Sequence, residues 1–107
     1  MWSYTRPDDP RFKWQPDGLL IQQRPGLPAT KIGCTHREQL VGYLNDGVRF
    51  TKTVAFDHDA RYPDGGCNLE IFTNSEMLEL ETLSGLVRLK AGESASHEEH
   101  WRLDQLN

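Results

Sequence analysis

Acidic side chains gather in two neighbouring segments of the chain. Glu70 lies in the segment 68–73, whereas Glu79 and Glu81 lie in the segment 77–83. Both segments alternate apolar and polar residues, so each is predicted to be a strand with its glutamates on one side. Carboxylates that share a sheet face repel one another, which raises a pKa toward the range of a general acid or base. The alternative interpretation is an ordinary solvated polar face of an antiparallel sheet.

A second group of chemically active side chains is the run His97-Glu98-Glu99-His100. On a helix such a run could form a metal-binding face. The segment 96–103 is instead predicted to be a strand, in which His97 and Glu99 point to one side and the other two to the opposite side. The four cannot then surround one ion, so we expect no metal and no other cofactor. His97 and Glu99 remain candidates to bind a ligand together.

Two further groups of residues complete the inventory. The run Asp57-His58-Asp59 offers too few oxygen ligands for a calcium loop and is interpreted as a solvated turn. The Trp and Tyr side chains suit a sugar, because sugar rings stack on aromatic planes while their hydroxyls pair with carboxylates, amides and guanidinium groups. Most of these rings are nonetheless expected in the core. They are Trp2, Tyr4, Trp14, Tyr43, Tyr62 and Trp101.

The elements that must position these residues are predicted to be antiparallel hairpins. An Asn-Asp-Gly turn at 45–47 is typical of a tight hairpin and joins 40–44 to 48–56, where Lys52 is the one polar residue on an otherwise apolar face. A second hairpin across residues 74–76 joins 68–73 to 77–83. That pairing would bring Glu70 near Glu79 and Glu81.

The rest of the chain fits the same all-β interpretation. Residues 1–18 are too rich in proline for a helix and carry aromatics that need burial, so they are predicted to form an extended arm packed on the rest. No segment keeps a helical period beyond one turn. We expect an all-β antiparallel sandwich in a single domain spanning 1–107. Further strands are predicted at 19–23, 29–34, 86–89 and 96–103.

Composition and charge exclude several classes of protein. Hydrophobic residues make up 36% of the 107 residues and charged residues 26%, which is too apolar for a wholly disordered chain. The 12 Lys and Arg against 16 Asp and Glu form no basic cluster, and no apolar run is long enough to span a bilayer, so neither nucleic acid nor membrane is expected as a partner. Without a recognisable leader the default location is cytoplasmic, with Cys34 and Cys67 as buried free thiols.

Short motifs in a fixed order resemble one protein family. The stretch 78–83, followed by 86–93 and then 97–101, resembles the C-terminal end of the aldose 1-epimerase (galactose mutarotase) superfamily. Three further motifs resemble uncharacterised bacterial members of that superfamily, so the similarity touches nearly the whole chain. They are Trp2-Ser3-Tyr4-Thr5-Arg6 with Asp9-Pro10-Arg11, then Lys31-Ile32-Gly33, then Tyr62-Pro63-Asp64-Gly65-Gly66 leading to Glu70.

The resemblance implies a fold and a site. The fold would be the C-terminal half of a galactose mutarotase-like supersandwich, and the ligand a small sugar. Glu81 matches the family's general base, which takes the proton from the anomeric hydroxyl while an acid protonates the ring oxygen. Substrate-binding roles are then expected for Glu70, Glu79, His97 and Glu99.

Departures from the family pattern shape the expected function. The family's acid histidine and sugar-binding arginine lie in an N-terminal half that has no match here, and Gly85 and Ala91 stand where related chains carry proline. We therefore expect a carbohydrate-binding domain with weak or no catalysis. The alternatives are an active aldose 1-epimerase completed by a partner chain and a non-catalytic homodimeric interaction module. Because a half sandwich leaves an apolar face and open edges, a homodimer is expected.

Overall fold

The computed structural model describes residues 1–106 and contains only strands as regular elements in that range. All strand pairs are antiparallel and fall into three sheets, which confirms the prediction of an all-β, sandwich-like antiparallel fold. The strands are β1 (Phe12–Gln15), β2 (Gly18–Ile21), β3 (Thr30–Cys34), β4 (Leu40–Asn45), β5 (Val48–Thr53), β6 (Leu69–Thr73), β7 (Leu78–Thr82) and β8 (His100–Gln105).

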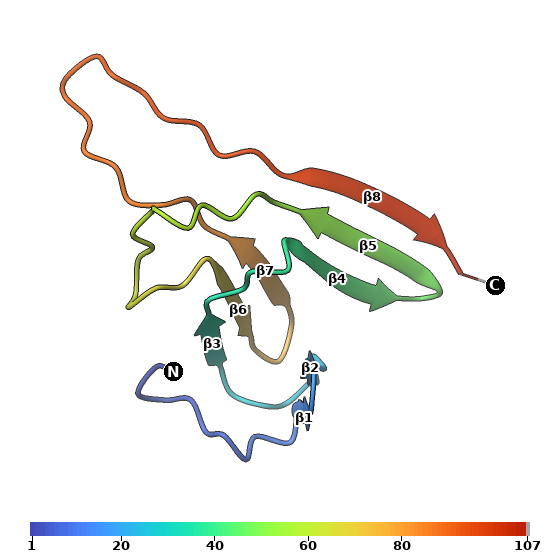
Figure 1. Ribbon diagram of the computed structural model, residues 1–107. Coiled ribbons are helices and arrows are strands. Elements are labelled where there is room, and N and C mark those ends of the chain that lie inside the picture. Colours follow the sequence, from blue (N-terminus) through green and yellow to red (C-terminus); the bar gives the residue numbers. More distant parts are fainter. Residues whose placement is uncertain (107) are drawn as a thin grey trace.

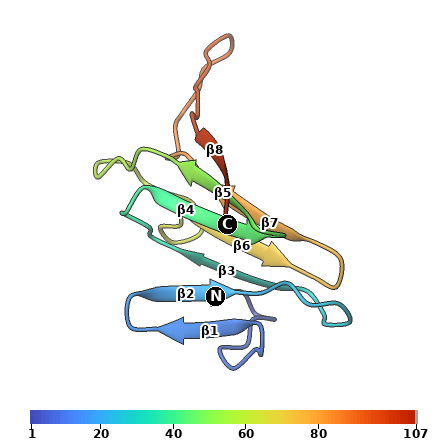
Figure 2. The same cartoon turned by 90° about the vertical axis from the view of Figure 1, so that its right-hand side faces the viewer.

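The three sheets are a hairpin and two three-stranded sheets. Their strand orders are β1-β2, β3-β6-β7 and β4-β5-β8. In Figure 1 β8 forms the outer edge of its sheet, and the long connection from β7 to β8 extends away from the rest of the chain. Figure 2 shows the β1-β2 hairpin at the opposite end of the molecule from β8.

Both predicted hairpins are confirmed. Asn45 pairs with Val48 across a two-residue loop in which Asp46 and Gly47 have φ of 49° and 76°, the left-handed conformation that matches the twist of a tight hairpin. In the β6-β7 turn the Asn74 side-chain oxygen accepts hydrogen bonds from two backbone amides, each 2.9 Å long. Local turn chemistry therefore fixes the register of both pairs.

Register divides the β3-β6-β7 sheet into two unlike faces, because residues directly opposite one another point to the same side. We call one side the acidic face; it carries Lys31, Gly33, Glu70, Phe72, Glu79 and Glu81. The other side is the apolar face of this sheet and carries Ile32, Leu69, Ile71, Leu78 and Leu80. The sequence predicted this separation for β6 and β7.

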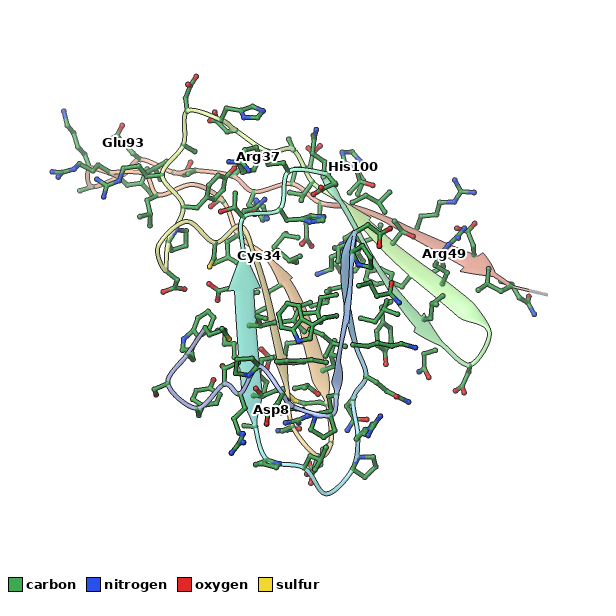
Figure 3. The ribbon with its side chains drawn as sticks, turned by 60° about the horizontal axis from the view of Figure 1, so that its bottom comes forward. Asp8, Cys34, Arg37, Arg49, Glu93 and His100 are labelled. Carbon is green, nitrogen blue, oxygen red and sulfur yellow. The ribbon has the colours of Figure 1, made fainter. Side chains whose placement is uncertain are left out.

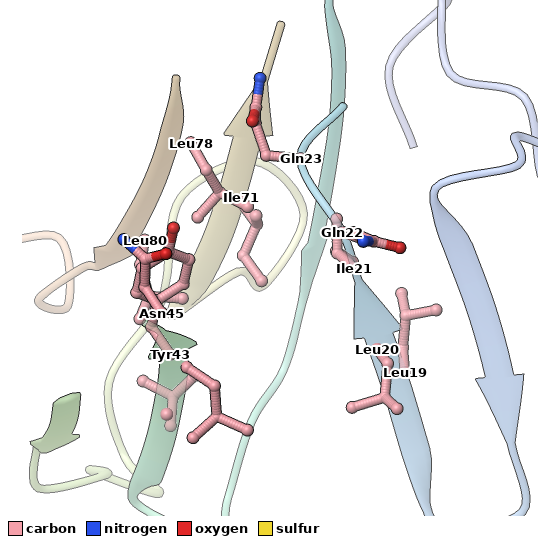
Figure 4. Close-up of a pocket in the computed structure, with 13 residues that line it drawn as sticks. Leu19, Leu20, Ile21, Gln22, Gln23, Tyr43, Asn45, Ile71, Leu78 and Leu80 are labelled. Carbon is pink, nitrogen blue, oxygen red and sulfur yellow. The ribbon is translucent and has the colours of Figure 1, made fainter. Parts of the chain in front are cut away.

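The apolar face turns toward β2 and the β4-β5-β8 sheet, but side chains do not fill the space between them. A cleft of about 390 Å³ lies between β2, β4 and the β6-β7 pair, with Ile71, Leu78 and Leu80 on one wall (Figure 4). A second hollow of about 310 Å³ separates Leu78 and Leu80 from the aromatic side chains of β4, β5 and β8. Lys52 bridges this hollow and donates a 2.6 Å hydrogen bond to the Leu80 carbonyl. Few apolar side chains are buried as a result.

The N-terminal arm packs on β3, as predicted, but its last part is more regular than expected. Phe12–Gln15 forms β1 and pairs with β2, whereas the sequence placed these residues in an irregular extended arm. Upstream of it the Trp2 ring lies against Gly33, and the Thr5 hydroxyl donates to the Lys31 carbonyl. Proline density excluded a helix here but gave no information on strand pairing.

The predicted strand at 86–89 is wrong, and the predicted strand at 96–103 begins only at His100. Residues 83–99 run as an extended connection whose backbone touches the rest of the chain at isolated points, such as the 2.6 Å hydrogen bond from Leu86 N to the Arg61 carbonyl. In Figure 3 Glu93 marks its far tip. Alternating residues require an extended backbone, but a strand also needs a neighbour to share its hydrogen bonds.

A substitution at Gly33 tests the packing of the arm. A β-carbon there would lie 2.7 Å from the Cys67 sulfur and 3.2 Å from the Trp2 ring. Overpacking of this kind typically costs about 1–3 kcal/mol, so Gly33→Ala should lower the free energy of unfolding by that amount. Gly18→Ala is the matched control, because a β-carbon at Gly18 meets no atom within 4 Å. Urea denaturation measures both; equal stability of the two variants would contradict the packing described here.

Candidate functional site

The centre of the acidic face is a pair of glutamates on adjacent strands. Glu70 of β6 lies directly opposite Glu81 of β7, with Glu79 on the same side of the sheet. Lys31 of β3 supplies the neighbouring positive charge, with its Nζ 3.0 Å from Glu70 Oε1. The pairing of three strands therefore collects three carboxylates, as the strand parity of β6 and β7 predicted, and adds one ammonium group that the sequence did not predict.

Glu70 is almost completely buried. Only 3% of its side chain is exposed, and its second carboxylate oxygen, Oε2, has no hydrogen-bond partner among the described residues. Burial and the neighbouring carboxyl of Asp64 raise the pKa of Glu70, and Lys31 opposes this shift only in part. An ionised Glu70 leaves Oε2 without a donor, whereas the protonated acid can donate to Asp64.

Asp64 reaches Glu70 from a strained loop. Asp64, Gly65 and Gly66 have φ of 55°, 79° and 117°, three consecutive residues with left-handed backbone. Two hydrogen bonds to the Pro63 carbonyl close the turn, from Gly66 N at 3.0 Å and Cys67 N at 2.8 Å. The two glycines adopt these angles at little cost, and this tight turn carries the aspartate to the buried end of the acidic face.

Glu81 is the carboxylate of this pair that a ligand can reach. Its side chain is half-buried on the sheet face, between buried Glu70 and exposed Glu79. Burial and a hydrogen bond with Glu79 raise the pKa of Glu81, while the charge of Lys31 counteracts the shift. Shared protons among close carboxyls are the expected response to mutual repulsion.

Aromatic side chains of the arm border the same face. The Lys31 ammonium lies 4.7 Å from the centroid of the Trp2 ring, a cation–π geometry. Its hydrogen bond to Glu70 is the main cause of the raised pKa of Lys31, and the charges of Glu81 and Tyr4 add to it. Trp2 is half-buried and its ring lies against Gly33, so an aromatic ring stands beside the carboxylates, while Tyr4 in the same arm is exposed.

The other two predicted binding residues lie on the opposite side of β7. His97 and Glu99 both contact the hydroxyl of Thr82. His97 Nε2 lies 2.8 Å from the hydroxyl oxygen, and Glu99 accepts a hydrogen bond from the hydroxyl group. Thr82 has the opposite parity from Glu81 in the same strand, so these side chains project from the other face. His97 and Glu99 do come together, but they are not part of the acidic face.

Glu99 sits among three donors. Burial disfavours its charge, but hydrogen bonds from Thr82 and Trp101, together with the charge of Lys52, outweigh this and lower the pKa of Glu99. Trp101 Nε1 donates to it over 3.0 Å, and Lys52 Nζ lies 3.4 Å away. This carboxylate is therefore ionised and fully engaged in joining β7 to the β4-β5-β8 sheet.

The remaining sequence motifs have structural roles. The Asp57–Asp59 run forms a turn in which Asp59 N donates to Asp57 Oδ1 over 2.9 Å. Cys67 is buried as predicted, but Cys34 is exposed at the end of β3 (Figure 3), and both thiols are free. Among residues 1–106 no cluster of three or more His, Cys, Asp or Glu side chains is arranged to hold a metal ion.

Sequence reasoning missed two residues of this site. Lys31 and Asp64 were each noted only as part of a motif, although both act on Glu70. Lys31 could have been found, because it alternates with Gly33 in a predicted strand and so lies on one face of it. No local pattern revealed that β3 pairs with β6 rather than with the nearer β4.

The pH dependence of stability tests the raised pKa of Glu81. The folded chain holds this proton more tightly than the unfolded chain, where the ordinary value is 4.5. The folded state therefore binds more protons, and Glu81 makes the chain less stable as the pH rises above 4.5 through the raised pKa.

Urea denaturation from acid to neutral pH should show the wild type losing stability relative to Glu81→Gln. Glu76→Gln, at the exposed β6-β7 turn, is the control and should follow the wild type. Parallel curves for the wild type and Glu81→Gln would contradict the shift.

Comparison with known proteins adds no relative to this geometry. No family model, no curated protein and no solved structure matches the chain. Within the residues that the structure describes, no helix is long and apolar enough to cross a membrane. The resemblance to the galactose mutarotase-like superfamily therefore stays a prediction from the motifs themselves.

Proposed function

We propose that the chain is a carbohydrate-binding domain of mutarotase-like type, and that its sugar lies on the acidic face against Glu81. The observation that carries this proposal is the pairing of Glu70 and Glu81 on adjacent strands beside Lys31. Carboxylates accept hydrogen bonds from sugar hydroxyls and an ammonium group donates to them. The resemblance of the Leu80-Glu81-Thr82 segment to the family's base position supports the same choice of residue.

The border of the acidic face supports a sugar over a simple cation. Trp2 and Tyr4 offer aromatic surface next to the charged groups, which fits a ligand that has apolar C–H faces as well as hydroxyls. Glu79 is exposed beside Glu81 and gives a second carboxylate within reach of the same ring. Glu70 is too buried to touch a ligand, so its role is to hold Lys31 in place beside Glu81.

The geometry favours binding over catalysis. Opening a pyranose ring needs a base at the anomeric hydroxyl and an acid at the ring oxygen, both next to one bound sugar. Glu81 supplies a base, but His97, in the connection after β7, contacts Thr82 on the opposite face of that strand and cannot reach the same ring. We therefore propose weak or no mutarotase activity for the single chain.

Ligand-observed NMR with a panel of hexoses and pentoses tests the binding. We expect saturation transfer to at least one sugar at millimolar concentration, and loss of that signal in Glu81→Ala because the main hydroxyl acceptor is removed. Glu98→Ala, an exposed carboxylate away from this face, is the matched control and should retain binding. Absence of contact with every sugar, or equal binding by the Glu81→Ala variant, would refute the proposal.

Polarimetry separates binding from catalysis. Freshly dissolved α-glucose and α-galactose should equilibrate with the protein at a rate close to that of buffer, and Glu81→Gln should not change this rate. A rate well above buffer that Glu81→Gln abolishes would instead establish an active epimerase, whose acid must come from a group other than His97.

A further inference from the structure

The chain exposes far more surface than a compact domain of its mass. Its accessible area is 8053 Å² at 12.3 kDa, whereas a folded monomer of this mass exposes about 6,100 Å². Its radius of gyration of 15.4 Å likewise exceeds the roughly 13 Å expected for this length. The surplus of about 2,000 Å² is comparable to what each subunit of an obligate homodimer buries.

Part of this surplus is an apolar surface on the β4-β5-β8 sheet. The register places six apolar side chains on one side, which we call the Trp101 face: Val41, Tyr43, Val48, Phe50, Trp101 and Leu103. β7 leans over one end of it through the hydrogen bond of Lys52. The β8 side of this face is uncovered, since Trp101 and Leu103 are 68% and 71% exposed. Large apolar side chains in one exposed patch typically mark an interface.

The same residues lie on an open sheet edge. β8 pairs with β5 on one side only, and no other described strand covers its outer edge (Figure 1). An unpaired edge presents free backbone donors and acceptors that another strand can use. A partner that adds a strand to β8 would satisfy these groups and extend the apolar face at the same time.

We propose that a second copy of this chain pairs its β8 antiparallel with β8 across a two-fold axis, so that the two Trp101 faces join into one continuous surface. A two-fold axis perpendicular to the sheet keeps both apolar faces on one side, so only residues of equal parity can lie opposite one another. The two central registers of this kind are centred on Arg102 and on Leu103. Charge decides between them.

Centring on Arg102 would place the two Arg102 guanidinium groups opposite each other, which is unfavourable. Centring on Leu103 pairs the two Leu103 side chains and places each Arg102 opposite Asp104 of the second copy. Within one chain Arg102 already points to Asp104, with Nε 3.0 Å from Oδ1, so both groups lie on the polar side of β8. The Leu103-centred register forms two such ion pairs across the axis. It gives one continuous six-stranded sheet and limits the assembly to two copies.

Sedimentation velocity over a concentration series tests the proposal on the full chain. We expect a dimer for the wild type and a dissociation constant raised by about tenfold or more in Leu103→Ser, because the apolar contact between the two Leu103 side chains across the axis is lost. Leu44→Ser is the matched control: Leu44 is 66% exposed on the opposite face of the same sheet and should leave the dimer intact. A monomeric wild type, an open-ended assembly or a dimer indifferent to Leu103→Ser would overturn the proposal.

Charge exchange tests the register. Arg102→Asp and Asp104→Arg should each weaken the dimer, because each places like charges across the axis, and the double variant should restore it. Dimerisation unchanged by both single exchanges would overturn the Leu103-centred register. The proposal is independent of the sugar site, since Glu81→Ala should remain dimeric whether or not it binds sugar.

Discussion

Side chains alternate between two environments along β7, and this alternation sets both the apolar packing and the placement of the acidic residues. Leu78, Leu80 and Thr82 point toward the β4-β5-β8 sheet, whereas Glu79 and Glu81 point to the other side. A shift of one residue would bury two carboxylates and expose two leucines, so burial on one side fixes the position of the acids on the other. One face of β7 therefore contributes to the thin apolar core, and its other face contributes to the candidate site.

Two lysines let a chain with a small core hold charged groups in partly buried positions. Lys31 neutralises part of the charge at Glu70, and Lys52 joins the sheets by binding both the Leu80 carbonyl and Glu99. Lys52 is the polar residue that interrupted an apolar strand pattern in the sequence, and the reason is now visible: its ammonium spans a hollow that apolar side chains do not fill. Removing one member of such a pair leaves the other charge uncompensated.

The proposed sugar site and the proposed dimer surface lie on different sheets and use different chemistry. The acidic face offers hydroxyl acceptors and an ammonium group, with Trp2 at its border. The Trp101 face offers apolar area and an open edge and carries Lys52 as its charged residue, whereas Arg102 and Asp104 lie on the reverse side. Binding of a ligand and self-association are thus separable properties, each with its own set of variants.

Local structure follows from residue alternation and turn residues alone, so the strand class, both tight hairpins and the side of β6 and β7 on which the glutamates lie could be predicted. Features that depend on contacts between remote segments could not. Tertiary structure paired β3 with β6, which brought Lys31 to Glu70, and it placed His97 and Glu99 at Thr82, behind Glu81. It also left 86–89 unpaired, since extended residues become a strand only beside a neighbour. Pairing between remote segments is set by the packing of whole sheets, which no short window of residues encodes.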